Sequence, residues 1–177
     1  MLKNKMGIIL EGLASRRVVE AVPEVAPVSK EGEVVSNILF CFDCSTSINL
    51  TDLNKYLDYI INLRSTLAEA KIDITFFGSK GIKIKKDVDD KFIKSLTPKN
   101  MKFGTTDHLG EIIQKVKFSK YDTIYICTDG QFNPTLTDED IKTVKKSASR
   151  IKWLVSKANG ETKDIKSMIT GANIELL

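Results

Sequence analysis

Three short apolar runs constrain the fold of this chain most strongly. Segments with helical spacing lie between them. The runs are Asn37–Asp43, Thr123–Cys127 and Ile151–Val155. Nearly every position in them is apolar, which is typical of strands buried on both faces, as in a parallel sheet. Helical patterns between such strands indicate right-handed crossover connections. The sequence therefore predicts a Rossmann-like, three-layer α/β/α fold whose sheet is mostly parallel.

The remaining elements follow from periodicity and turn signals. Helical spacing is present at 52–70, 89–96, 107–116, 137–149 and 163–169, and further strands are expected at 72–77, 82–86 and 173–177. The turn at 78–81 is too short for a crossover, so we expect 82–86 to be an antiparallel edge strand. We expect Thr51 or Asp52 to cap the first helix, and Thr137 to open the fourth with a capping pattern.

The first 35 residues differ from the rest of the chain. They contain Pro23, Pro27 and a Val-rich acidic stretch, after a short amphipathic segment near 3–15. We interpret residues 1–35 as an N-terminal arm and residues 36–177 as one domain. The pattern leaves open whether the arm is a disordered tail or packs on the domain or on a neighbouring subunit.

Charge and hydropathy argue against several classes of protein. The net charge of the 177 residues is +4, and no apolar stretch approaches the roughly 20 residues that span a membrane. Glu11 and Arg16 interrupt the apolar N-terminal segment, so we expect no cleaved signal peptide. The densest lysines, from Lys80 to Lys86, are typical of a solvated edge strand, and no aromatic residues interleave with them. We therefore expect neither membrane insertion nor nucleic-acid binding.

The cysteine content favours a reducing compartment. The chain has three cysteines, an odd number that argues against a disulfide framework and suits the cytoplasm, or a virion if the protein is viral. Cys41 and Cys127 lie within apolar strands and are expected in the core. Cys44 has C-x-x-C spacing to Cys41, but no second pair follows and His108 is the sole histidine, so a zinc site is not expected.

Polar residues gather where the predicted parallel strands end. Asp43 ends the first run, Ser45 and Ser47 follow it, Asp129 follows the second run, and Gly104–Asp107 lead into a helix. Because open α/β sheets bind ligands at the carboxyl ends of their strands, we expect these side chains on one rim. Carboxylate and hydroxyl oxygens suit Mg²⁺, Mn²⁺ or Ca²⁺ rather than zinc. Because the site offers so few carboxylates, a bound ion keeps part of its positive charge. A coordination position also stays free for a carboxylate from another molecule.

At these residues the chain resembles the von Willebrand factor A (vWA) family. The metal-ion-dependent adhesion site of that family has the pattern Asp-x-Ser-x-Ser, then a distant Thr, then an Asp after a later strand. The matching residues are Asp43, Ser45, Ser47, Thr106 and Asp129. The resemblance implies that Ser45, Ser47 and Thr106 contact the ion directly, and that Asp43 and Asp129 do so directly or through water.

The resemblance covers residues 36–177 and is nearer to intracellular bacterial and phage-type members than to secreted adhesion proteins. It implies a non-enzymatic protein-interaction module that binds Mg²⁺ or Mn²⁺, with an Asp or Glu of the partner completing the coordination. Some such members work beside AAA+ ATPases, so the expected partner is such an ATPase or a subunit of a larger assembly.

Two alternatives stay open at this point. A PIN-like metal-dependent ribonuclease would use a cluster of carboxylates to activate water. Its candidates are Asp43, Asp107, Asp129 and Asp138. That hypothesis leaves Ser45, Ser47 and Thr106 without a role. The other alternative is a metal-independent structural subunit, viral or otherwise, that assembles through the N-terminal arm.

Overall fold

The structure is a computed structural model, and it describes residues 35–67, 69–78, 82–97, 101, 109–132, 135–156 and 162–177. Apart from Val35, the predicted N-terminal arm lies outside these ranges. So do most of the predicted turn at 78–81 and the residues from 102 to 108.

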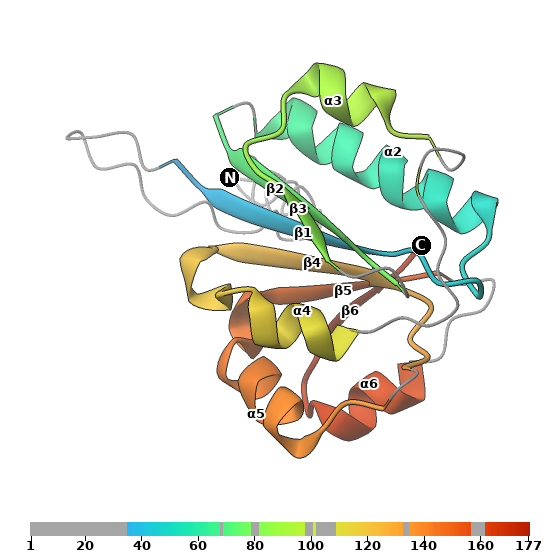
Figure 1. Ribbon diagram of the computed structural model, residues 1–177, viewed down its shortest axis with the longest axis vertical. Coiled ribbons are helices and arrows are strands. Elements are labelled where there is room, and N and C mark those ends of the chain that lie inside the picture. The colour runs from blue at the N-terminus through green and yellow to red at the C-terminus, as the bar shows by residue number, and fades with distance from the viewer. Residues whose placement is uncertain are drawn as a thin grey trace, which may run out of the picture. The chain divides into compact units, whose positions relative to one another are not determined.

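The described residues form one mixed sheet with the strand order β3-β2-β1-β4-β5-β6 (Figure 1). The strands are β1 (Asn37–Asp43), β2 (Lys71–Phe77), β3 (Lys83–Lys85), β4 (Thr123–Thr128), β5 (Ile151–Val155) and β6 (Asn173–Leu176). Strand β3 pairs with β2 in antiparallel fashion at the sheet edge, and every other pair is parallel. The predicted fold class, including the antiparallel edge strand, is therefore confirmed.

Helices cover both faces of the sheet, as the crossover pattern requires (Figure 1). One layer holds α2 (Leu50–Thr66) and α3 (Asp90–Ser95), and the other holds α4 (Leu109–Lys115), α5 (Asp138–Lys146) and α6 (Thr162–Met168). Two single 3₁₀ turns, η1 (Phe118–Lys120) and η2 (Ala148–Arg150), lead into β4 and β5. Among the described helices, none is long and apolar enough to cross a membrane.

The two faces of β1 feed separate apolar layers. Phe40 and Phe42 pack against the α2 side, whereas Leu39 and Cys41 pack against the α4 side. This alternation follows from the two-residue period of a strand. All four side chains are fully buried, so β1 is the centre of the core and its carboxyl end is held rigidly.

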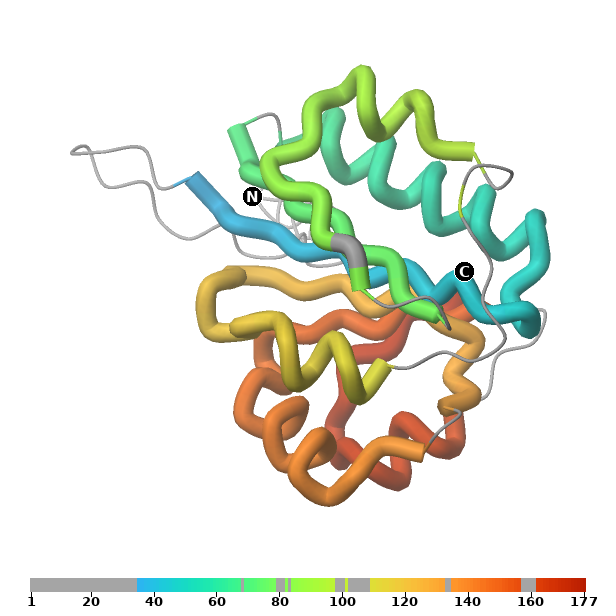
Figure 2. Tube along the Cα trace, in the orientation of Figure 1, coloured from blue at the N-terminus to red at the C-terminus, as the bar shows by residue number. Residues whose placement is uncertain are grey.

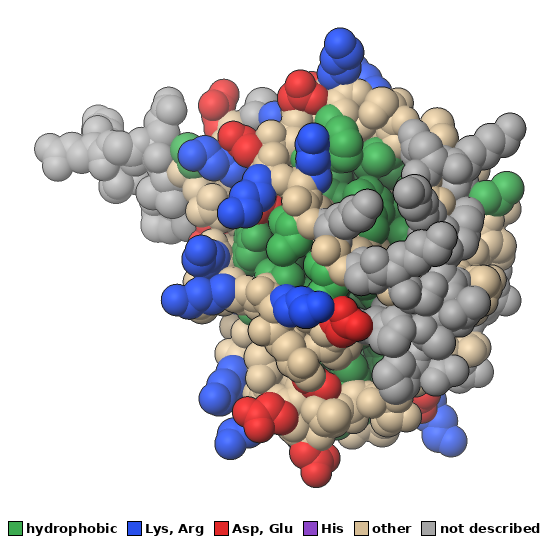
Figure 3. Space-filling model, in the orientation of Figure 1, with side chains coloured by type: hydrophobic (Ala, Val, Ile, Leu, Met, Phe, Trp, Pro, Cys, Tyr) green, Lys and Arg blue, Asp and Glu red, His purple; other side chains and the backbone are tan. Residues whose placement is uncertain are grey.

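The edge strand β3 has the polar character that its sequence indicates. Lys85 and Lys86 are exposed, and the ammonium group of Lys85 lies 5.4 Å from the ring centroid of Phe92. Figure 3 shows Lys and Arg side chains scattered over this face among acidic ones, not gathered in one patch. These positions match the interpretation of the lysines as solvated edge residues.

The start of α2 differs from the prediction. Asn49, not Thr51 or Asp52, is the N-cap, and its side chain accepts a hydrogen bond of 2.9 Å from the backbone N–H of Asp52. Asp52 does not cap because its carboxylate turns inward and is fully buried. The helix also ends at Thr66 instead of residue 70. By contrast, the capping box of Thr137 and Asp140 at the start of α5 is confirmed.

Candidate metal site

The candidate site lies at the carboxyl ends of β1 and β4, which are neighbours at the middle of the sheet. Their register pairs Phe42 with Cys127, so Asp43 and Thr128 follow at the same level. Figure 2 shows both strands ending on the same side of the molecule, where the chain leaves for α2 and for α5. Because the strands are parallel, the two loops that follow them meet at one rim.

Asp43 is held in one orientation by two hydrogen bonds. Its Oδ1 accepts from the backbone N–H of Ser45 at 2.9 Å, and its Oδ2 accepts from the hydroxyl of Thr128 at 3.0 Å. Burial raises the pKa of this carboxyl to about 6; the Ser45 and Thr128 bonds oppose that rise, and the charge of Asp129 adds to it. The protein therefore holds a poorly solvated negative charge at this position near neutral pH.

Asp129 offers a carboxylate oxygen that the described residues leave without a hydrogen bond. Its Oδ1 accepts from the backbone N–H of Gln131 at 2.9 Å, whereas its Oδ2 is buried and has no partner among the described groups. The next residue, Gly130, has a φ of 85°, a left-handed conformation that glycine favours. A buried carboxylate oxygen without a partner is costly, and a cation would offset that cost.

Ser45 and Ser47 place two hydroxyls side by side. Their Oγ atoms share a hydrogen bond of 3.0 Å; Ser45 is buried and Ser47 is exposed. An octahedral Mg²⁺ ion with ligands at roughly 2.1 Å has neighbouring ligands about 3 Å apart. The spacing of the two hydroxyls therefore fits adjacent positions on one such ion.

The structure brings together four of the five predicted ligands. Asp43, Ser45 and Ser47 lie in one loop, and Asp129 is close enough to raise the pKa of Asp43 by its charge. Thr106 lies outside the described residues. The role of these five residues as metal ligands stays a prediction.

The carboxylates named for the ribonuclease hypothesis do not all lie at one place in the described structure. Asp107 lies outside the described residues, and Asp138 is exposed at the start of α5, where it lines a surface hollow with Lys142 and Lys145. Within the described ranges, no three His, Cys, Asp or Glu side chains form a group that could hold a metal ion. The pair Asp43 and Asp129 is instead accompanied by hydroxyls.

The sequence pattern did not identify the buried polar residues that lie behind the rim. The Tyr56 hydroxyl donates to the backbone carbonyl of Thr128 at 2.9 Å, and Ser156 after β5 donates to Oδ1 of Asp52. The other oxygen of Asp52 is buried without a partner among the described residues. Tyr56 follows the helical apolar spacing like any core residue, so only the packing of α2 on the sheet reveals its contact.

The cysteine beside the site is a packing residue. Cys44 is 1% exposed, and burial, followed by the charge of Asp43, raises the pKa of its thiol to about 12. The thiol therefore stays protonated and unreactive at neutral pH. Cys41 and Cys127 are also buried, and burial raises the pKa of both, as expected for core residues.

Comparison with known proteins bears on the fold. No protein-family model matches the chain, and no curated protein matches it. The chain is similar to the crystal structure of the SpRpn10 VWA domain, with a TM-score of 0.52 and 16% sequence identity over 81% of this chain and 87% of that one. At this identity the similarity concerns the fold alone. Together with the strand order and the single antiparallel edge strand, it shows that the chain has a von Willebrand factor A-type α/β fold.

Proposed function

We propose that this protein is a non-enzymatic interaction module that holds Mg²⁺ or Mn²⁺ with Asp43, Ser45, Ser47, Thr106 and Asp129. A bound ion would supply an open coordination position for an Asp or Glu side chain of a protein partner. The vWA-type fold supports an interaction role in general. The bound ion and the carboxylate of the partner are more specific than the fold alone supports, and they are what this proposal adds.

One observation carries the proposal: the buried Oδ2 of Asp129, without a partner among the described groups, beside the buried carboxylate of Asp43. Two ionised carboxylates that lie close together in a poorly solvated region repel each other. A divalent cation removes that repulsion and supplies the missing partner. The hydroxyls of Ser45 and Ser47, 3.0 Å apart, provide additional oxygen ligands of the kind that Mg²⁺ accepts.

The chain's own residues set the properties of the proposed interface. Asp43 is oriented by the Ser45 N–H and the Thr128 hydroxyl, so its carboxylate needs no rearrangement when an ion arrives. Ser47 is exposed at the rim, where a partner would approach. Hydroxyl ligands add no negative charge, which preserves the attraction between the site and an acidic side chain.

The class of partner follows from this chemistry. It presents an Asp or Glu on a protruding loop or segment, and an AAA+ ATPase or another subunit of a larger assembly remains our proposed source, by resemblance to intracellular vWA proteins. We place the interaction in the cytoplasm, because the three cysteines are free and buried.

The test is capture of partners from cell extract by the full chain in Mg²⁺, in EDTA, and with Asp43→Ala in Mg²⁺. We expect a specific partner to bind wild type in Mg²⁺ and to be lost in the other two samples. Mutating acidic residues of that partner to amides should then abolish binding.

Two other outcomes identify the alternatives. Cleavage of RNA in Mn²⁺ that is lost in Asp129→Asn would contradict the proposal and favour a nuclease. A partner that binds equally in EDTA and depends on residues 1–35 would favour a metal-independent assembly subunit.

A further inference from the structure

The hydroxyl of Thr128 has its single proton committed to the candidate site. Its Oγ1 accepts a hydrogen bond of 3.1 Å from the backbone N–H of Gly130 and lies 3.0 Å from Oδ2 of Asp43. A hydroxyl has one proton to donate. Because an ionised carboxylate is only an acceptor, that proton is directed to Asp43. Thr128 is fully buried, so water does not compete for it.

The backbone of Thr128 is in turn fixed from α2. The Tyr56 hydroxyl donates to the Thr128 carbonyl oxygen at 2.9 Å, and the backbone N–H of Ser156 approaches the same oxygen at 3.4 Å. Tyr56 is itself fully buried, so its ring has little room to move. Thr128 is thus held at its backbone while its side chain holds Asp43.

We propose that Thr128 is a positioning residue of the metal site and that Tyr56 supports it, so that α2 and the end of β4 together set the orientation of Asp43. This inference rests on the proposed function. It adds that affinity for the ion depends on two residues that would not touch it. It also implies that packing of α2 on the sheet and occupancy of the site are coupled.

The expected size of the effect follows from comparable sites. Losing a hydrogen-bond partner of a metal-ligating side chain typically lowers metal affinity about 10- to 100-fold. Thr128 bonds Asp43 directly and should fall in that range. Tyr56 acts one bond further away, and the Ser156 N–H still reaches the same carbonyl, so we expect a loss of about two- to fivefold.

The experiment measures binding of Mn²⁺ alone to the full chain, by the electron paramagnetic resonance signal of the free ion. Thr128→Val keeps the shape of the side chain and removes the hydroxyl. Thr128→Ser keeps the hydroxyl and should restore most of the affinity. Tyr56→Phe removes only the distal hydroxyl.

Two variants serve as matched controls. Thr75→Val makes the same change at a buried threonine whose hydroxyl has no hydrogen-bond partner among the described residues. Tyr121→Phe removes a tyrosine hydroxyl that donates to Asp73 at 2.8 Å, far from the rim. Neither control should change Mn²⁺ affinity. Circular dichroism in EDTA checks that every variant is folded.

The outcomes are distinguishable. Weak binding by Thr128→Val with recovery in Thr128→Ser supports the inference. Wild-type affinity in both Thr128→Val and Tyr56→Phe overturns it and leaves the proposed function intact. Equal losses in Thr128→Val and Thr75→Val also overturn it, because the loss is then general to buried threonines. Absence of Mn²⁺ binding in wild type overturns the proposed function and this inference with it.

Discussion

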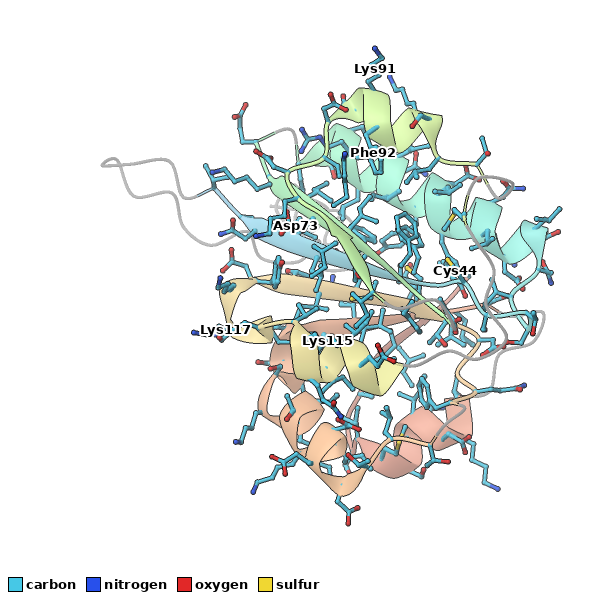
Figure 4. The ribbon with its side chains drawn as sticks, viewed as in Figure 1. Cys44, Asp73, Lys91, Phe92, Lys115 and Lys117 are labelled. Atoms are coloured by element: carbon cyan, nitrogen blue, oxygen red, sulfur yellow. The ribbon has the colours of Figure 1, made fainter. Side chains whose placement is uncertain are left out.

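The two ends of the sheet use acidic residues in different ways. At the amino end, Asp73 accepts from the Asp87 N–H and from the Tyr121 hydroxyl, both at 2.8 Å, so each of its oxygens has a partner. At the carboxyl end, Asp129 keeps one buried oxygen without a partner among the described residues. Figure 4 labels Asp73 at one end of the sheet and Cys44, next to Asp43, at the other.

The difference lies in which buried carboxylate oxygens have a hydrogen-bond partner. Asp73 has both oxygens bonded and joins segments of the chain. Asp43 is also bonded at both oxygens, but it lies close enough to Asp129 to be affected by the charge of that carboxylate. A buried carboxylate with an unbonded oxygen has lost its water without full compensation, which proteins tolerate where a ligand supplies the missing interaction. Among the described residues, the buried carboxylate oxygens without a partner belong to Asp129 and Asp52, both at the carboxyl end of the sheet, and that end holds the candidate site.

The sharpest test of this comparison exchanges one carboxylate for an amide at each end. Asp129→Asn keeps the acceptor for the Gln131 N–H but turns an amide toward the proposed ion. We expect Mn²⁺ affinity to fall more than about 100-fold, beyond the 10- to 100-fold typical of a lost outer partner. Asp73→Asn should leave Mn²⁺ affinity unchanged, as measured by isothermal titration calorimetry. Equal losses in the two variants would contradict the distinction.

The second test varies pH. Burial raises the pKa of Asp43 to about 6 in the metal-free protein, so protons compete with the ion below that pH. We expect Mn²⁺ affinity to fall about tenfold per pH unit below 6 and to level off above it. An affinity that is constant between pH 7 and pH 5 would contradict a role for Asp43 in binding.

The raised pKa also has a consequence for stability. Because the folded pKa of Asp43 lies above its ordinary value of 3.8, this group stabilises the metal-free fold fully below pH 3.8. That contribution is lost as pH rises through about 6 and is on the order of 1–3 kcal/mol. Urea unfolding in EDTA should therefore show a smaller dependence on pH between 4 and 7 in Asp43→Asn than in wild type.

The smallest expected effect belongs to the amino end. Tyr121→Phe removes the hydrogen bond to Asp73 and should lower the free energy of unfolding by about 1 kcal/mol. Because this bond lies at the amino end of the sheet, the stabilisation of the protein by added Mg²⁺ should be the same as in wild type. Thermal unfolding with and without Mg²⁺ measures both quantities. A changed response to Mg²⁺ would show that the two ends are not independent.

Most of the fold could be predicted from the sequence because its strong signals are local. Strands β1 and β5 begin and end where the apolar runs do. Thr137 and Asp140 form their capping box because both partners lie within one turn. The predicted N-cap of α2 was wrong, because several polar residues near the start of that helix could act as its cap. Which of them caps depends on where each side chain points after α2 packs on the sheet.

The sequence by itself determined which residues follow the central strands, and therefore that Asp43, Ser45, Ser47 and Asp129 end near one rim. Strand-end placement is local, and parallel pairing makes the ends of such strands coincide. Only the tertiary structure decided which carboxylate oxygens have partners. The bonds of Thr128 to Asp43, and of Tyr56 to Thr128, join residues 85 and 72 positions apart in the chain. No spacing in the sequence encodes such bonds, because they depend on how β1 pairs with β4 and on how α2 packs against them.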